Sequence, residues 1–438
     1  MLSYVDIKNK MISIALVTLL GMLVGVAAGL LPALPVFTGP MILYLFVNNN
    51  YPILHLLIFW MVSYSGTQFF GSIATITTKI PGEESSAIYL PDIDRLGIEE
   101  KKHLLFDTAV GSFVAGTFSI LLVWTIVMFV NPNIFPALLG YQIQLIAYLF
   151  AIFLLILSGK PRWASILLII AGLMIGPKQN YALPVWWYDL TFFFSGYTLY
   201  MIVLGTILIP SLFVPARQIS TISEYTIKSK IPNIWIIIKS TVIGIFAGIV
   251  PGASASIATT LAYNTQKESN NSPYNKILAA ETANNAAVVI VAIPFFILGL
   301  PINQNTLLMS NIMDIQSLNI IEEITKVITP LTLVMLIAFV LYFWLSTHLI
   351  NWYANTVNIL HNKMKWIVAI ILLVLITADL QYSEITLYRY CYLLIGFTIF
   401  GFVIRFFKWS AIPFLFAVVL SDKFVWLGVQ TINFIVSK

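Results

Sequence analysis

The sequence predicts an all-α polytopic membrane protein of about 10–12 transmembrane helices, in two pseudo-symmetric repeats with broken helices or re-entrant hairpins. Three observations support this prediction. Of the residues, 59% are hydrophobic and only 9% are charged, with a mean hydropathy of +0.93, whereas soluble domains carry about 25% charged residues. Apolar runs long enough to cross a lipid bilayer recur along the chain. A short sequence pattern also occurs twice, half a chain apart.

The repeated pattern is Gly-x-x-Ala-Gly-x-x-Pro. It covers residues 25–32 and then residues 244–251, which lie 219 positions later in a chain of 438. A second pair agrees, because Pro81 and Pro301 each begin a polar turn and lie 220 positions apart. Discontinuous helices at corresponding places in two halves are typical of transporters, whose binding sites lie near the membrane midplane.

The first half is predicted to be residues 1–218. Its first run, about 11–31, carries glycines at four-residue spacing, which favours a packed helix over a cleaved signal peptide. The run at about 52–78 ends in small and hydroxyl residues, and the loop at 79–102 holds most of this half's charge. Prolines, basic residues and a Trp-Trp-Tyr cluster separate the other apolar segments, which cover about 39–47, 104–130, 143–158, 163–176 and 191–214.

The second half is predicted to be residues 219–438, and it begins with an apolar helix broken at Pro251-Gly252. Proline removes an amide donor and glycine tolerates unusual conformations, so backbone groups near the break need partners that lipid cannot supply. The break therefore indicates a binding site, with a simple kinked, packed helix as the alternative. An apolar run at 277–300, a polar hairpin at 301–314 and spans at about 325–346, 366–378, 386–404 and 411–432 follow. Loop charge leaves open whether the halves are inverted or parallel.

The remaining composition argues against several function classes. The net charge is +5, but the basic residues lie in short loops, where they set membrane topology and do not indicate nucleic acid binding. The single cysteine, Cys391, excludes an internal disulfide and cysteine-based metal sites. The four histidines lack metalloprotease spacing, and no phosphate-binding loop is present. We therefore expect a lipid-embedded protein that is not an enzyme, with no catalytic residues, metal or cofactor.

Glu281 is the strongest chemical signal in the sequence. It lies in an otherwise apolar run, with Asn284 and Asn285 three and four residues later on the same helix face. An ionisable side chain at membrane depth is costly unless it is paired or hydrated, so it indicates a functional site. We expect these three residues to couple transport to Na⁺ or H⁺. The alternative is that Glu281 lies at the membrane edge.

A solute site is expected at the helix breaks and their polar turns, because freed amides at helix N-termini bind anionic groups. The expected residues are Gly29, Pro32, Pro81, Gly82, Ser85, Ser86, Pro251, Gly252, Ser254, Ser256, Pro301, Asn303 and Asn305. Lys79 is positioned to neutralise a carboxylate, although a surface role is the alternative. Asp92 and Asp94 form too small an acidic group for a metal-dependent transferase, and we expect a solvated loop there.

These motifs resemble those of the large membrane subunit of the tripartite tricarboxylate transporters. The resemblance rests on Gly248-Ile-Val-Pro-Gly-Ala-Ser-Ala-Ser256, Glu281-Thr-Ala-Asn-Asn-Ala-Ala287, Gly71-Ser72 followed by Ile80-Pro-Gly-Glu-Glu-Ser-Ser86, and Gly111-Ser-Phe-Val-Ala-Gly-Thr117. It extends over nearly the whole chain and weakens after about residue 330. It adds Gly71 and Ser72 to the expected solute site.

The resemblance implies a multi-pass permease subunit in the cell (inner) membrane, driven by an ion gradient. It further implies a small membrane subunit and an extracytoplasmic solute-binding protein that delivers carboxylate-type solutes. Two other classes stay open at this point, namely a membrane-embedded enzyme and a non-transporting receptor on a transporter-like scaffold. Counterflow of labelled organic acids separates the first class from the other two.

The sequence departs from the family pattern at the expected pocket. Ala33 and Pro35 follow the first-half proline, where the family usually has glycine, and Ile302-Asn303 replace a usual Gly-Ser. Lys79 stands where the family commonly has asparagine. These changes leave the fold prediction unaltered and leave open which carboxylate is the solute.

Overall fold

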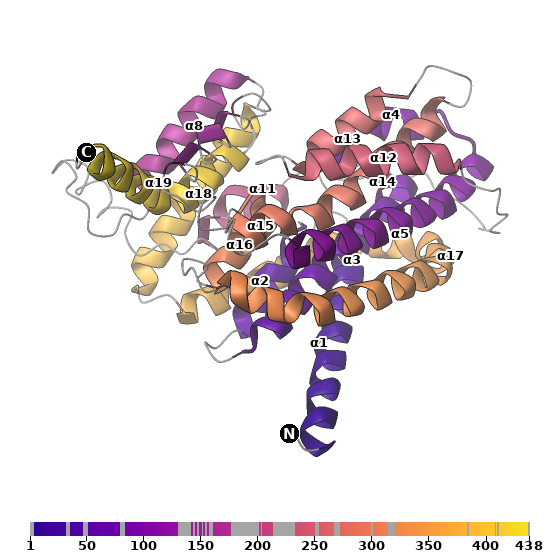
Figure 1. Ribbon diagram of the computed structural model, residues 1–438. Helices are drawn as coiled ribbons and strands as arrows, with labels where there is room; N and C mark the ends of the chain where they lie inside the picture. Colours follow the sequence, from indigo (N-terminus) through magenta and orange to yellow (C-terminus); the bar gives the residue numbers. More distant parts are fainter. Residues whose placement is uncertain are drawn as a thin grey trace.

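The computed structural model is all-helical in the part of the chain that it describes (Figure 1). The described residues are 4–31, 36–46, 51–78, 84–129, 142, 145–146, 149–150, 152–153, 156, 161–176, 201–202, 204–212, 233–249, 254–266, 272–298, 301–313, 320–382, 385–407, 409 and 411–436.

The first half contains five elements that matter for the site. They are α1 (Tyr4–Leu30), α2 (Thr38–Phe46), α3 (Ile53–Thr78), the 3₁₀ helix η1 (Glu84–Tyr89) and α5 (Ile98–Phe129), with α4 (Leu90–Ile93), α8 (Arg162–Ile175), the π-helix η2 (Leu204–Leu208) and α11 (Ile209–Leu212) completing the described helices. The predicted segments at 11–31, 39–47, 52–78, 104–130 and 163–176 are confirmed as helices. The stretch predicted as a loop at 79–102 contains η1, α4 and the start of α5, which begins at Ile98. Only scattered residues of the span predicted at 143–158 are described, all of them helical, and much of the span predicted at 191–214 lies outside the described residues.

The helix break predicted in the second half is present. The chain forms α12 (Ile234–Gly248), α13 (Ser254–Asn264), α14 (Ser272–Ile290), α15 (Ala292–Leu298), α16 (Gln304–Met313), α17 (Ile320–Tyr382), α18 (Leu387–Phe406) and α19 (Ile412–Val436). Helix α12 therefore ends just before Pro251, although Pro251 and Gly252 themselves lie outside the described residues.

The spans predicted at 325–346 and 366–378 are not separate helices, because both belong to the 63-residue helix α17. At 1.5 Å per residue α17 is about 95 Å long, roughly three times the thickness of a bilayer core. Within the residues that the structure describes in full, its Glu323–Ile350 section is a candidate span.

The chain is a multi-pass membrane protein. Among the described residues, six helices are long and apolar enough to cross a membrane, fewer than the 10–12 crossings predicted for the whole chain. These candidate spans are Met11–Leu30, Ile53–Thr77, Glu99–Phe129, Pro273–Ile297, Glu323–Ile350 and Leu387–Phe406.

Helices α3 and α14 form the centre of the molecule. Their candidate spans are 89% and 94% buried, against 22% for α1. Helix α1 packs on α3 and α12 packs on α14, while α5 contacts both central helices and α17, and α17 also packs on α3. Glycine permits the close approach: a Cβ added at Gly25 would lie 2.8 Å from the Ser63 carbonyl oxygen, and one at Gly248 would lie 2.9 Å from the Ala287 Cα. Helices α8, α18 and α19 lie at one end (Figure 1).

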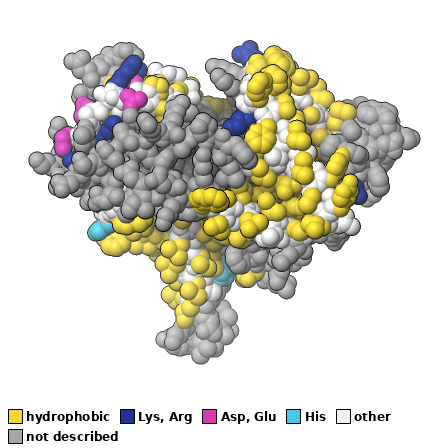
Figure 2. Space-filling model, turned by 180° about the vertical axis from the view of Figure 1, so that it is seen from behind, with side chains coloured by type: hydrophobic (Ala, Val, Ile, Leu, Met, Phe, Trp, Pro, Cys, Tyr) yellow, Lys and Arg dark blue, Asp and Glu magenta, His cyan; other side chains and the backbone are white. Residues whose placement is uncertain are grey.

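The surface is apolar, and many polar side chains lie inside. Leu16, Leu20 and Leu23 of α1 are each more than half exposed, whereas Ser63 and Gln68 of α3 are buried. Figure 2 shows hydrophobic side chains over much of the described part of one face, with charged side chains in small groups. Lipid accepts such a surface, whereas water does not favour an apolar patch of this extent.

Candidate functional site

Six of the predicted site residues line one pocket between the two halves. The pocket is bounded by α1, α3, η1 and α14. We call it the polar pocket. Its lining residues are Ala28, Gly29, Val36, Thr67, Gln68, Gly71, Ser72, Thr75, Ser86, Glu281 and Asn284. The expected solute residues and the expected ion-coupling residues therefore share one site.

Glu281 is buried in this pocket with only 3% of its surface exposed. Its carboxylate Oε1 accepts a hydrogen bond from the Tyr89 hydroxyl, which comes from the end of η1. A buried carboxylate is retained only where hydrogen bonds or charges satisfy it. The first half thus supplies a donor to the carboxylate of the second half.

The amides beside Glu281 have different partners. Asn284, one helical turn after Glu281, donates from Nδ2 to the Gln68 Oε1 of α3 at 2.9 Å. Asn285 is buried but lies outside the pocket lining, and its Nδ2 donates to the backbone carbonyl of Glu281 at 3.0 Å. Asn284 therefore faces the pocket with Glu281, whereas Asn285 bonds within its own helix.

Three hydroxyl groups of α3 present oxygen lone pairs to the pocket. Thr67, Ser72 and Thr75 each donate their hydroxyl proton to a carbonyl of the same helix, at 2.8, 2.9 and 2.9 Å. A hydroxyl that donates its one proton retains lone pairs that accept or bind cations. Oxygen lone pairs beside a carboxylate are the chemistry that hard cations prefer.

The described lining residues include no Lys, Arg or His, so an anionic group entering the polar pocket would meet the carboxylate of Glu281 without a compensating side-chain cation. Within the described part of the chain, no cluster of three or more His, Cys, Asp or Glu side chains could hold a metal ion.

Three predicted solute residues lie elsewhere, at the start of α16. Asn303 donates from Nδ2 to the Tyr64 hydroxyl at 2.9 Å, and its Oδ1 accepts from the Thr306 amide at 2.9 Å, which caps α16. Pro301 and Asn305 are buried beside it, and no hydrogen-bond partner of the Asn305 Oδ1 occurs among the described residues. None of the three lines the polar pocket.

The other predicted residues are only partly placed. Ser85 is buried in η1, next to the pocket-lining Ser86, and Ser254 is buried at the first position of α13. The Ser254 Oγ has no partner among the described residues. Lys79, Pro32, Pro81, Gly82, Pro251, Gly252 and the side chain of Ser256 lie outside the described residues.

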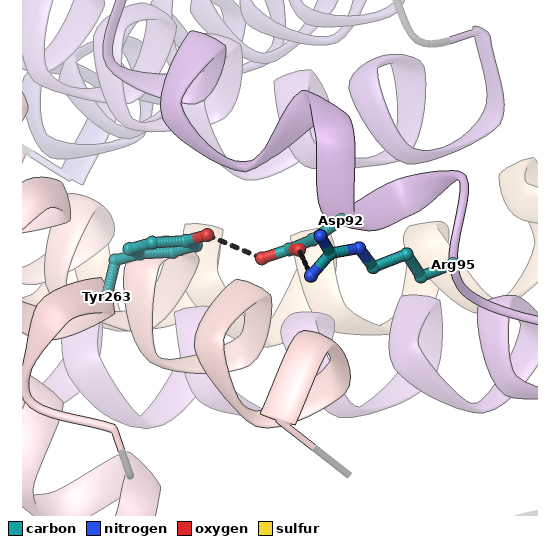
Figure 3. A network of polar contacts seen from close by, with 3 residues as sticks. All are labelled: Asp92, Arg95 and Tyr263. Carbon is teal, nitrogen blue, oxygen red and sulfur yellow. Dashed lines mark hydrogen bonds and ion pairs between the residues drawn. The ribbon is translucent and has the colours of Figure 1, made fainter. Parts of the chain in front are cut away.

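The expectation of a solvated loop at Asp92 is wrong. Asp92 is buried, accepts a hydrogen bond from the Tyr263 hydroxyl at 2.5 Å, and pairs with Arg95 at 3.1 Å (Figure 3). Tyr263 belongs to α13, so this contact joins the loop of the first half to the helix after the break. Asp94 is exposed, as expected.

Two important residues were missed in the sequence. Gln68 is a buried amide in an apolar run, so the rule that drew attention to Glu281 applied to it as well. Tyr89 gave no such signal, because tyrosine is common near membrane interfaces and its partner lies 192 positions away.

Comparison with protein-family models identifies one family. The model of the Tripartite tricarboxylate transporter TctA family matches residues 15–416. A protein of Agrobacterium vitis described as "Uncharacterized 52.8 kDa protein in TAR-I ttuC' 3'region" is 25% identical over 313 residues, which cover 65% of this chain and 59% of that protein. The chain thus aligns with less than two thirds of this relative's length. No solved structure matches the chain.

Proposed function

Because the chain belongs to the tripartite tricarboxylate transporter TctA family, we propose that it is the permease subunit of a secondary transporter that imports carboxylate-type solutes. The family is one of transporters and not of enzymes. The proposed driving force is a gradient of Na⁺ or H⁺, and the proposed place where ion and solute meet is the polar pocket.

The observation that carries this proposal is the buried carboxylate of Glu281 in a pocket that also holds hydroxyl and amide groups. Two unit charges 4 Å apart interact by about 4 kcal/mol at an effective dielectric constant of 20. A solute carboxylate at that distance from ionised Glu281 would thus be disfavoured by about a thousandfold in affinity. A bound Na⁺, or a proton on Glu281, removes this repulsion.

This electrostatic condition produces coupling. The ion raises the affinity for the solute, and by thermodynamic reciprocity the solute raises the affinity for the ion by the same factor. The stable states are then the pocket that holds both the ion and the solute and the pocket that holds neither. A pocket that holds the solute alone is rare. A carrier that changes conformation mainly in those two states moves both ligands together.

The proposed partners are a small membrane subunit and an extracytoplasmic solute-binding protein. The word "tripartite" in the family description supports them. We expect slow uptake by proteoliposomes that contain this chain alone, and faster uptake after the two partners are added. High-affinity uptake that partners leave unchanged would contradict this part of the proposal.

Ligand binding by the purified chain tests the function directly. Thermal unfolding is followed with citrate and other organic acids, in Na⁺ or K⁺ at equal ionic strength and at several pH values. A ligand at 100 times its Kd stabilises the folded state by about 2.7 kcal/mol. We expect stabilisation by a carboxylate only with Na⁺ or at low pH. A requirement for Na⁺ at constant pH identifies Na⁺ as the coupling ion, and a requirement for low pH identifies H⁺. Stabilisation by a carboxylate that depends on neither Na⁺ nor pH would refute ion coupling. If no carboxylate stabilises the chain under any of these conditions, the proposed solute class is refuted.

A further inference from the structure

The two halves pack with matching contacts. On α1, a Cβ added at Gly25 would meet Ser63 and Gly66, whereas one added at Gly244 of α12 would meet Ala283 and Ala286. One turn later, Gly29 approaches Thr67 and Phe70, and Gly248 approaches Ala287 and Ile290. Each contact partner in the second half lies 220 positions after its counterpart in the first half.

The helices also contact one another in exchanged pairs. Helix α5 of the first half packs on α14 of the second, and α17 of the second half packs on α3 of the first. Likewise η1 packs on α13 and α16 packs on α2, while α3 meets α14 and α5 meets α17. Such a pattern of exchanges is what an approximate two-fold relation between the halves produces.

A second, smaller pocket lies where this relation would place the counterpart of the polar pocket. It lies between α3, α14, α15 and α17, and we call it the apolar pocket. Its lining residues are Trp60, Met61, Tyr64, Ser65, Val288, Val289, Ala292 and Met335. Four of these stand 220 positions from residues of the polar pocket: Met61 from Glu281, Tyr64 from Asn284, Val288 from Gln68 and Ala292 from Ser72.

We propose that the halves form two equivalent positions and that only the polar pocket binds the ion and the solute, because Glu281 and Gln68 there correspond to Met61 and Val288. This inference rests on the proposed function for the identity of the ligands. The carboxylate of Glu281, both amides and the hydroxyl of Ser72 have no equivalent at the second position, where Met61, Val288, Tyr64 and Ala292 stand. Tyr64 there bonds to Asn303, whereas Asn284 bonds to Gln68.

The proposal divides the sequence-predicted residues by role. Gly29, Gly71, Ser72 and Ser86 belong to the binding position with Glu281. Asn303 instead contacts Tyr64 of the apolar pocket, and it caps α16 and joins that helix to α3. The chain therefore has one set of ion- and solute-binding side chains, whereas a repeated architecture would allow two.

A matched pair of cysteines tests this asymmetry without any transport assay. In the full chain carrying Cys391→Ser, either Ser72 or its counterpart Ala292 is replaced by cysteine. Each variant is treated with the water-soluble cationic reagent 2-aminoethyl methanethiosulfonate, with and without Na⁺ plus citrate. A thiol in apolar surroundings is inert, so we expect Ser72→Cys to react at least about tenfold faster than Ala292→Cys, and Na⁺ plus citrate to slow only Ser72→Cys.

The outcomes separate this inference from the proposed function. Equal labelling of the two cysteines, or ligand protection of Ala292→Cys, would overturn the asymmetry. Fast labelling of Ser72→Cys that no carboxylate or cation slows would support the asymmetry and contradict the proposed ligands. If Ala292→Cys fails to fold, Val288→Cys and Gln68→Cys provide the same comparison at the second pair of counterparts.

Discussion

Replacement of Glu281 by glutamine tests the core of the mechanism. Glutamine keeps the volume and one acceptor oxygen of the side chain and removes its charge. Because Glu281 is buried, that charge is weakly screened and expensive to retain. We therefore expect the variant to fold, with unchanged or higher thermal stability, and to lose the dependence of solute binding on the ion.

The size of the effect follows from the burial of the carboxylate. A monovalent cation 4 Å from the carboxylate gains about 4 kcal/mol at an effective dielectric constant of 20. Desolvation of the carboxylate and the ion offsets part of this gain, so a net loss of about 2–4 kcal/mol, or about 30- to 1000-fold in ion affinity, is expected.

The assay is the Na⁺ and pH dependence of citrate binding by the purified chain, measured by calorimetry. Glu323→Gln is the matched control, because Glu323 is an exposed carboxylate near the start of α17. We expect the control to bind as the parent does. A folded Glu281→Gln variant with the parent's ion affinity would show that coupling does not depend on this carboxylate.

Three further predictions concern the contacts around the site. Tyr89→Phe removes a hydrogen bond that stabilises the ionised carboxylate of Glu281, and we expect ion affinity to rise about 10- to 100-fold, whereas Tyr64→Phe at the apolar pocket should leave it unchanged in the same titration. Gly248→Ala places a Cβ against α14 and should lower unfolding stability by about 1–3 kcal/mol. The same change at exposed Gly396, which has open space, should be neutral or stabilising in thermal unfolding. Tyr263→Phe should cost about 1–2 kcal/mol through the lost bond to buried Asp92, and unchanged stability would mean that this contact does not hold the loop on α13.

Local sequence properties determined most of the architecture. Hydropathy and charge depend on composition alone, so they identified a helical membrane protein and most of its described helices. Proline and glycine act on their own backbone, so the break after Gly248 was predictable. Glu281 stood out because a carboxylate is costly in an apolar run, wherever the rest of the chain lies. The two-repeat arrangement stays a prediction, now supported by matching contacts.

Tertiary structure decided which residues meet. Asn284 faces Gln68 across 216 positions and Glu281 meets Tyr89 across 192, and no local pattern encodes such distant pairs. The predicted solute residues therefore formed one group in the sequence, whereas packing places Ser72 beside Glu281 and Asn303 against Tyr64. Asp92 became buried for the same reason, because its partner Tyr263 arrives from the other half of the chain.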